Sequence, residues 1–373
     1  MSMKFNASSS DLVKALSAVS GAVPNKATLP ILETILFESE DGKLRLTATD
    51  LEISIIEYMS ADIEEDGAVA IPARRLIETL RQLPDIPVSF EVDDNFNIKF
   101  RTDKGTYKLV GEDPDEFPEV PNLNEGQKLE TTKDDILKAI DKTLFAVSDD
   151  DLRPAMMGVL FEIGPDESKF VATDGHRLVK FIKSDLTADQ EMKFIVPEKA
   201  LNLVQKALHA EECDMTVTED HVRFKSGNTI VITRLINEQY PNYESVIPRD
   251  NDKLMRIDKE QMLATVKRVS IFSSSTTRQI RLQLHKDKIT IRAEDIDMSS
   301  EAKETISCEY ENDEIEIGFN AKYLADVLGN VDDEEIHFEF STPNRAGIVK
   351  PSEEDENEQM LMLVMPVMLN SYA

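Results

Sequence analysis

The residues best suited to chemistry form one short cluster, Asp174-Gly175-His176-Arg177. A carboxylate, an imidazole and a guanidinium so close together could act as the acid and base of a hydrolase. His176 has no nucleophile at a recognisable spacing, however. Asp174 also ends a triplet, Ala172-Thr173-Asp174, that recurs as Ala48-Thr49-Asp50 and, altered, as Ala293-Glu294-Asp295. A repeated position of this kind favours a structural role, so we predict that the chain is not an enzyme.

Other catalytic signatures are missing from the sequence. There is no phosphate-binding loop, no dinucleotide fingerprint and no cluster with metal-ligand spacing, so we predict neither a cofactor nor a metal site. Cys213 and Cys308 are isolated and lie in different repeats, which is typical of a protein of the reducing cytoplasm. No apolar run approaches the ~20 residues of a membrane span, and the N-terminus lacks the apolar region of a signal peptide.

Basic helix faces offer a second chemistry, the binding of phosphate groups. The apolar periodicity predicts six helices, over residues 11–21, 73–83, 133–147, 197–210, 258–270 and 320–330. These segments carry more basic than acidic residues, although the net charge of the chain is −30. In the fourth segment Lys199, Lys206 and His209 share one face, opposite Leu201 and Val204. One such face is most often simply solvated, but a bias over all six favours a confined DNA-binding surface.

The helices belong to a sequence that is written three times, at intervals of about 120 residues. A second marker, Pro72-Ala73-Arg74, returns as Pro197-Glu198-Lys199 and Asn320-Ala321-Lys322. Each repeat is long enough for a domain with its own core, and each contains two strand–helix–strands units. We predict an α+β fold of three tandem similar domains, with aperiodic boundaries at Asp113–Gly126 and Pro241–Asp252. The predicted domains comprise residues 1–125, 126–250 and 251–373.

Helix geometry limits how such domains could surround DNA. Packed helix axes lie about 8–10 Å apart, so six helices in a ring leave no usable hole. Twelve helices, from two chains, leave a bore of roughly 24 Å, whereas duplex DNA is on the order of 20 Å across. A dimer could therefore hold a duplex and a monomer could not.

Several motifs, spread over the whole chain, are distinctive of one family. They are Thr28-Leu29-Pro30-Ile31-Leu32, Thr49-Asp50-Leu51-Glu52, Val171-Ala172-Thr173-Asp174-Gly175-His176-Arg177-Leu178, Tyr240-Pro241-Asn242-Tyr243, Gly318-Phe319-Asn320 and Val364-Met365-Pro366. With them the chain resembles the bacterial β sliding clamp, the processivity subunit of the replicative DNA polymerase. The resemblance implies a homodimeric ring with sheets outside and helices lining the hole. Such a ring encircles duplex DNA without sequence preference, tethers polymerases and other replication and repair proteins, and is opened by a clamp loader.

The expected DNA contacts combine the resemblance with the helix charges. The resemblance implies contacts at Lys26 and Arg74. The helix charges add Arg75, Lys138, Lys142, Lys199, Lys206, Lys267 and Arg268. A loop that carries DNA-contacting tyrosines in the family corresponds to Asp150–Ala155. Here Pro154 and Ala155 stand in their place, and Asp149-Asp150-Asp151 would repel phosphate.

The resemblance also implies a pocket between the second and third domains, where polymerase and clamp-loader subunits dock a short apolar peptide motif. Its expected positions are Arg153, Met156, Thr173, Gly175, His176, Arg177, Leu178, Pro241, Val246, Tyr323, Val364, Met365, Pro366 and Met368. From the residues alone, the stretch from Met365 to Leu369 could equally be a core strand. The tail departs from the family, because no arginine follows Met365-Pro366 and Asn370–Ala373 extends past the usual end. The acidic run Lys350–Glu358 is predicted to be a solvated loop.

The implied subunit seam pairs a strand of the first domain with the third domain of the partner. Tyr107 and Leu109 are expected on one side, and Ile271 and Phe272 on the other. From the residues alone, all four could equally be core. An acidic scaffold that binds only proteins stays open as an alternative, because it would use the same ring and pocket and leave the hole empty.

Overall fold

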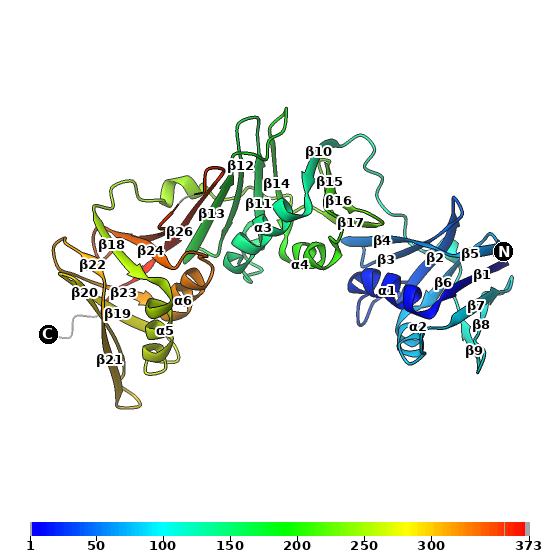
Figure 1. The fold of residues 1–373 in the computed structure, drawn as a ribbon, viewed down its shortest axis with the longest axis horizontal. Helices are drawn as coiled ribbons and strands as arrows, with labels where there is room; N and C mark the ends of the chain where they lie inside the picture. The colour runs from blue at the N-terminus through cyan, green and yellow to red at the C-terminus, as the bar shows by residue number, and fades with distance from the viewer. Residues whose placement is uncertain (1, 354, 370–373) are drawn as a thin grey trace. The chain divides into compact units, whose positions relative to one another are not determined.

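The computed structural model describes residues 2–353 and 355–369 (Figure 1). The chain forms two compact units. The N-terminal unit contains the residues up to Leu137 together with Lys199–Leu235. The C-terminal unit contains Lys138–Glu198 together with the residues from Ile236 onward.

The six predicted helices are confirmed, with their ends shifted by a few residues. They are α1 (Ser9–Val19), α2 (Ala73–Leu80), α3 (Lys133–Thr143), α4 (Glu198–Ala207), α5 (Lys259–Ser270) and α6 (Ala321–Gly329). Polar side chains begin four of them: Ser8, Thr132, Asp258 and Asn320 accept a backbone N–H of the first turn of α1, α3, α5 and α6. Helix α3 ends earlier than predicted because the chain tightens into a 3₁₀ turn at Leu144–Ala146.

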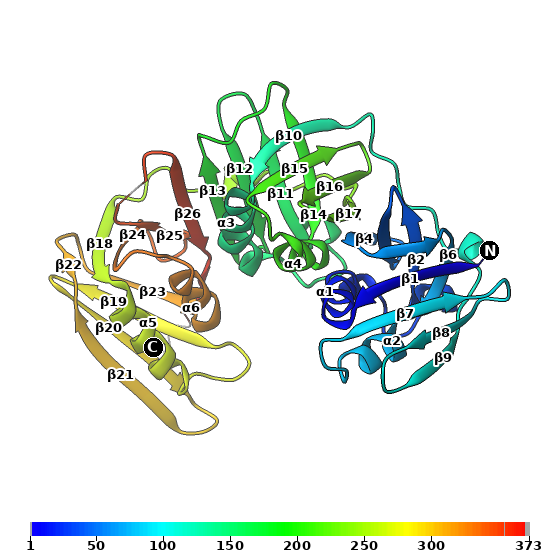
Figure 2. The same ribbon diagram turned by 45° about the vertical axis from the view of Figure 1, so that its right-hand side comes forward.

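The N-terminal unit contains two antiparallel sheets. The first has the order β5 (Asp62–Glu65), β1 (Met3–Ser8), β7 (Pro87–Val92), β8 (Asn97–Arg101) and β9 (Thr106–Val110). The second has the order β10 (Gln127–Thr132), β15 (Glu212–Val217), β16 (His221–Ser226), β17 (Thr229–Arg234), β4 (Ile53–Ser60), β3 (Lys43–Thr49), β2 (Thr34–Glu40) and β6 (Ala68–Pro72). Helix α1 packs on β3 and β4 and against α2 (Figure 2).

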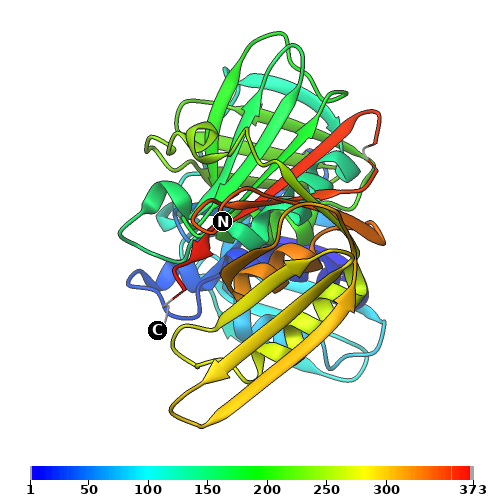
Figure 3. The same ribbon diagram turned by 90° about the vertical axis from the view of Figure 1, so that its left-hand side faces the viewer.

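The C-terminal unit repeats this plan. Its larger sheet has the order β14 (Met192–Pro197), β11 (Gly158–Ile163), β12 (Ser168–Thr173), β13 (Arg177–Lys183), β26 (Glu358–Val364), β25 (Gly347–Pro351), β24 (Glu335–Phe340), β18 (Lys253–Asp258) and β22 (Glu309–Tyr310). Its smaller sheet has the order β21 (Ser300–Ser307), β20 (Lys288–Asp295), β19 (Gln279–His285), β23 (Ile315–Asn320) and β27 (Pro366–Val367). Strands β20 and β21 form a long hairpin at the edge of that sheet (Figure 3).

Both large sheets run across an expected domain boundary. Strand β4 of the first repeat pairs with β17 of the second, and β13 of the second repeat pairs with β26 of the third. The strands β4, β13 and β21 occupy the same place in the three repeats, and so do β9, β17 and β26. Each junction is therefore a backbone hydrogen-bond ladder rather than a contact of side chains alone.

Two segments differ from their sequence-based description. Asp113–Gly126 is aperiodic as predicted, but it is packed: Phe117 is buried over the first repeat, and Leu123 is buried against Ile56 of β4 and Ile232 of β17. The prediction that Lys350–Glu358 is a solvated loop was wrong at both ends. The run begins inside β25 and ends at Glu358, whose mostly buried carboxylate forms ion pairs.

Candidate functional site

The loop Thr173–Arg177, between β12 and β13, is shaped by its own side chains. The Asp174 carboxylate accepts the backbone N–H groups of His176 (2.8 Å) and Arg177 (2.9 Å). The Thr173 hydroxyl donates to the Arg177 carbonyl (2.7 Å) and accepts the Gly175 N–H. Gly175 has φ +87°, and a Cβ there would lie 2.7 Å from Nη1 of Arg153, so the backbone conformation and the close approach both require glycine.

Two carboxylates and two aromatic rings hold the Arg177 side chain in place. Its side chain is only 8% exposed and forms ion pairs with Asp174 (3.2 Å) and with Asp326 of α6. The guanidinium also lies 5.1 Å from the ring centroid of Tyr323 and 5.5 Å from that of Phe145. With two carboxylate partners, its charge is already neutralised, so Arg177 shapes the site rather than presenting a free cation to a ligand.

The exposed part of the loop faces the third repeat. The His176 ring stacks on Tyr323 at a centroid distance of 5.2 Å, and the His176 carbonyl accepts the N–H of Met365 (2.8 Å). Burial raises the pKa of Tyr323, and the nearby Asp174 carboxylate adds to this, so the phenol stays neutral at physiological pH. Arg153 closes the other side by donating to the Asp174 carbonyl (2.9 Å).

Beneath the loop lies an apolar floor. The buried cluster comprises Leu160, Val171, Leu178, Ile195, Tyr240, Tyr243, Ala346 and Leu363. Three apolar pocket candidates are instead exposed: Val246 (49%), Met365 (38%) and Met368 (81%). An apolar floor with an exposed, methionine-rich rim can accept apolar side chains of different shapes.

Most of the predicted pocket residues contact one another in the structure. Arg153 reaches Met156 (Nη1–Sδ 3.8 Å), and Val364 lies opposite Arg177 in the β13–β26 ladder. Pro366 follows Met365 in the short strand β27, where it pairs with Phe319 of β23. Arg177 and Val364 are buried, and so belong to the walls. The sequence analysis missed Phe145 and Asp326, which lie far from Arg177 in sequence and carry no motif of their own.

The predicted DNA-binding residues fall into two groups. Four are exposed and make no ion pair within the described part of the chain: Lys26, Arg75, Lys206 and Lys267. Four others differ in having an acidic partner in the same chain: Arg74 with Glu78, Lys138 with Glu358, Lys199 with Asp50 and Arg268 with Glu304. An exposed ion pair is worth little, so these four can still exchange partners.

Lys142 does not fit the predicted basic surface. Its side chain is only 11% exposed, and its ammonium group lies 2.5 Å from the carboxylate of Asp332. The same ammonium group donates to the carbonyl of Asn330 (3.5 Å). Lys142 therefore ties α3 of the second repeat to the loop after α6 of the third, which the helix pattern could not reveal.

In the acidic loop before the pocket, the Asp150 carboxylate has partners within the loop itself. Backbone N–H donation from Leu152 and the Arg153 guanidinium lower the pKa of Asp150. Asp150 thus positions Arg153 by an ion pair of 2.9 Å. Leu152 at the tip is 90% exposed.

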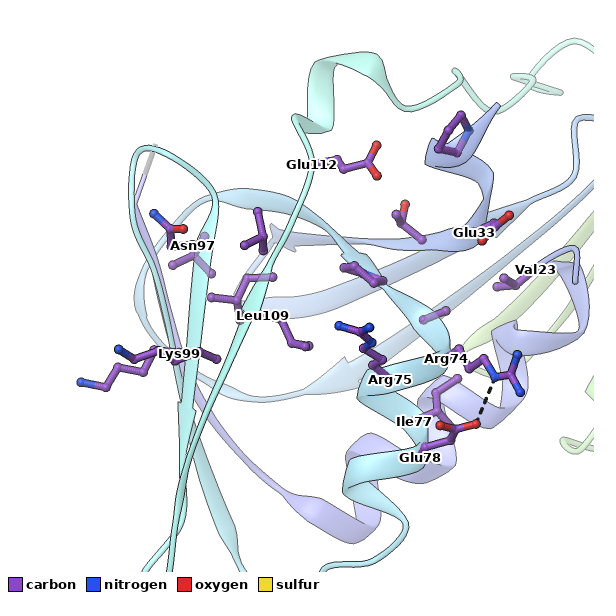
Figure 4. Close-up of a pocket in the computed structure, with 18 of the residues that line it drawn as sticks. Val23, Glu33, Arg74, Arg75, Ile77, Glu78, Asn97, Lys99, Leu109 and Glu112 are labelled. Carbon is purple, nitrogen blue, oxygen red and sulfur yellow. Dashed lines mark hydrogen bonds and ion pairs between the residues drawn. The ribbon is translucent and has the colours of Figure 1, made fainter. Parts of the chain in front are cut away.

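The four predicted seam residues are all at least partly exposed. Tyr107 and Leu109 are half-buried on β9, the edge strand of its sheet, and Tyr107 stacks on Phe100 at 4.8 Å. Ile271 is 77% exposed and Phe272 is 40% exposed, just past the end of α5. Beside β9 lies a hollow of about 1600 Å³, which Leu109, Val110 and residues of α2 line together (Figure 4).

Residues 2–353 and 355–369 contain neither a group of side chains suited to a metal ion nor a membrane-spanning helix. No three His, Cys, Asp or Glu side chains in this part could together hold a metal ion. No helix in the same part is long and apolar enough to cross a membrane.

Comparison with known proteins gives one consistent result. The models of the N-terminal, central and C-terminal domains of the DNA polymerase III beta subunit match residues 3–121, 130–242 and 244–367. The beta sliding clamp of Pseudomonas aeruginosa is 30% identical over 372 residues, covering 98% of this chain and 100% of that protein. The beta sliding clamp of Bacillus subtilis is 28% identical, covering 98% of this chain and 99% of that protein.

Solved structures agree with these matches. The P. aeruginosa DNA polymerase sliding clamp with ligand has a TM-score of 0.93 at 30% identity, over 98% of this chain and 100% of that one. A Bartonella birtlesii clamp bound to griselimycin has a TM-score of 0.92 at 27% identity, over 99% and 100%. The C. crescentus clamp, with PEG bound to a putative beta-motif tethering region, has a TM-score of 0.92 at 28% identity, over 99% and 100%.

Proposed function

Because the chain belongs to the bacterial β sliding clamp family, the DNA polymerase III beta subunits, we propose that two copies form a ring that slides on duplex DNA. The ring tethers the replicative polymerase and other replication and repair proteins, and a clamp loader opens and closes it. The observation that carries this proposal is the match over all three domains, from residue 3 to residue 367. In this proposal the domains comprise residues 1–125, 126–250 and 251–373.

The mechanism is topological and needs no catalysis. A closed ring leaves DNA only by opening or by reaching an end, so tight phosphate contacts are unnecessary. Tight contacts would also make the grip steeply dependent on salt and would hinder sliding. The net charge of −30 and the few unpaired basic side chains on the helices suit a weak grip. We assign the protein no catalytic residues and place it in the bacterial cytoplasm, where replication occurs.

The DNA-facing surface is assigned to the exposed basic residues of the helices and the loop before β2. Reversing the charge of Lys26, Lys206 and Lys267 together should shorten the retention of the loaded ring on nicked circular DNA. The matched control reverses three exposed lysines on strands, Lys43, Lys193 and Lys225. A scaffold that binds only proteins would respond to neither set, so equal retention of both variants would refute DNA encirclement.

The pocket around His176 is assigned to a short apolar peptide motif of the polymerase and clamp loader. The floor offers buried apolar side chains, and the stack of His176 on Tyr323 forms one exposed wall. His176→Ala should weaken binding of a polymerase-derived peptide, measured by fluorescence anisotropy, while the circular dichroism spectrum stays unchanged. His285→Ala, on β19, is the matched control. Unchanged affinity of the His176 variant would remove this residue from the pocket.

A further inference from the structure

The acidic loop Asp149–Asp151 does not suit the DNA-facing surface of the proposed ring. Asp149 and Asp151 are exposed and form no ion pair within residues 2–353 and 355–369. The third carboxylate, that of Asp150, is paired with Arg153. Exposed carboxylates repel the phosphates of DNA. The side chains of Asp149 and Asp151 are therefore available to a different ligand, one that is cationic.

The equivalent loop of the first repeat has the opposite charge. Both loops follow a helix that ends in a 3₁₀ turn, and both lead into a second 3₁₀ turn that begins with a proline, Pro30 or Pro154. When the loops are aligned on these prolines, Lys26 takes the place of Asp150. Lys26 is assigned to DNA in the proposed ring. The same backbone thus carries one loop suited to phosphate and, in the second repeat, one suited to a cation.

The acidic loop is continuous with the wall of the peptide pocket. Arg153, directly after the loop, donates to the Asp174 carbonyl (2.9 Å) and so ties the loop to the turn Thr173–Arg177. Burial is the main cause of the raised pKa of Tyr323, and the charges of Asp174 and Asp149 add to it. The charge of Asp149 therefore acts on an exposed wall of the pocket. A peptide that leaves the pocket on this side passes the loop.

The two arginines of the pocket do not offset the charge of the loop. Both already have carboxylate partners: Arg153 pairs with Asp150 (2.9 Å), and Arg177 pairs with Asp174 and Asp326. Residues 149–153 and 173–177 together contain four aspartates and two arginines, which gives a formal charge of −2. The rim of the pocket on this side is therefore electronegative.

Leu152 adds an apolar surface next to these carboxylates. Its side chain is 90% exposed, at the tip of the loop. A single exposed leucine needs no explanation by itself. Lysine and arginine, however, have long apolar stems that pack on apolar surface while their charged heads reach a polar partner. Leu152 together with Asp149 or Asp151 matches both parts of such a side chain.

We propose that Asp149, Asp151 and Leu152 select docking peptides in which lysine or arginine flanks the apolar motif. The stem of the basic side chain packs on Leu152, and its charged head lies beside Asp149 or Asp151. The apolar floor of the pocket holds the motif, and the loop discriminates between motifs by their flanking residues. This inference rests on the proposed function of the pocket and names the class of peptide that the pocket prefers.

The test compares three labelled peptides by fluorescence anisotropy. They share the apolar core of the polymerase-derived peptide used for the His176 variant, and they carry two lysines, two serines or two glutamates on each side. At low salt the wild type should bind the lysine-flanked peptide about tenfold more tightly than the glutamate-flanked one, as expected for a few exposed charge pairs. The serine-flanked peptide should lie between them. At about 0.5 M salt the preference should fall to about twofold, because exposed charges are screened.

Variants of the loop locate the preference. Asp149→Lys combined with Asp151→Lys should reverse it, and Leu152→Ser should weaken only the lysine-flanked peptide, about threefold. The matched control is Asp189→Lys combined with Glu191→Lys, which changes two exposed acidic residues at the same spacing, in the loop between β13 and β14. The control should keep the wild-type preference, which excludes a general effect of the net charge of −30. Thermal unfolding checks that all variants are folded.

Two kinds of result separate this inference from the pocket assignment. The inference is overturned if the wild type binds all three peptides within about twofold of one another at low salt. It is also overturned if the preference survives charge reversal of the loop or is lost in the control. In these cases the peptides still bind, and the pocket assignment stands if His176→Ala weakens them. If the wild type binds none of the peptides at micromolar concentration, the pocket assignment itself fails and this inference fails with it.

Discussion

Replacing Arg177 tests how the peptide pocket is held together. In Arg177→Met, Asp174 loses its ion pair while its side chain is only 12% exposed, although it keeps two backbone N–H donors. Asp326 is 36% exposed and can be rehydrated. Breaking a fully buried pair costs 3–5 kcal/mol, so we expect a value near the lower end, about 3 kcal/mol. Asp326→Asn removes only the more exposed partner and should cost about 1 kcal/mol.

The assay is thermal unfolding followed by circular dichroism, with amide hydrogen exchange of β12 and β13 to assign the transition. The exchange data are needed because a multidomain chain need not unfold in one step. For a unit of this size, 1 kcal/mol shifts the midpoint by about 2–4 °C. Arg177→Met should therefore lower the midpoint by roughly 6–12 °C, and Asp326→Asn by roughly 2–4 °C.

The double mutant tests whether Arg177 and Asp326 stabilise the fold through their mutual ion pair. Once Arg177 is gone, Asp326→Asn should cost almost nothing more, because its partner no longer exists. The reasoning is refuted if the two effects simply add. It is also refuted if Arg177→Met shifts the midpoint by less than about 1 °C and β13 exchanges at the wild-type rate. Either result would mean that strand pairing alone positions the loop.

Three further predictions concern other groups. Lys142→Met should lower the unfolding midpoint but leave retention on circular DNA unchanged, because the Lys142 side chain is buried. Lys206→Met should shorten retention and leave the unfolding midpoint unchanged. Loss of retention in the Lys142 variant would contradict this assignment. Burial raises the pKa of Glu57, opposed by the Thr229 hydrogen bond, so folding favours the neutral carboxyl and stability is lost as pH rises through the folded pKa. Glu57→Gln should thus gain stability relative to wild type between pH 4 and pH 7 in urea titrations; a constant difference would refute this. Burial raises the pKa of Cys213 to about 12 and that of Cys308 to about 11, so a chromogenic disulfide reagent at pH 8 should react slowly with both thiols until guanidinium is added.

The local structure of this protein could be predicted from its sequence, but the contacts between residues far apart in the chain mostly could not. Helix positions such as 73–83 and 258–270 followed from apolar stripes, and the second of these helices also has a polar cap at Asp258. Both signals lie within a dozen residues. The role of Lys142 depended on Asp332, far away in the chain, and no local pattern encodes such a pair. The same holds for Arg177 and Asp326.

The packing of the boundary segment could not be predicted from the sequence either. Asp113–Gly126 lacks periodicity because it is an irregular segment that packs on the sheet. Which of its residues are buried, such as Phe117 and Leu123, depends on the strands that they contact. The loop residues of the pocket were identified by resemblance rather than by chemistry. Their repeated triplet gave the only physical signal, since Thr49 and Asp50 make the same turn bonds as Thr173 and Asp174.

The hydrogen-bond ladders at the two junctions have a consequence for dissecting the molecule. A fragment cut at the sequence boundaries, residues 126–250, would lose the partner strands of both β13 and β17. It would then present two bare strand edges, which are templates for self-association and aggregation. The three repeats are thus separable in sequence but not as independently expressed modules, and a shortened version that keeps its solubility must retain a whole ladder on each side of every cut.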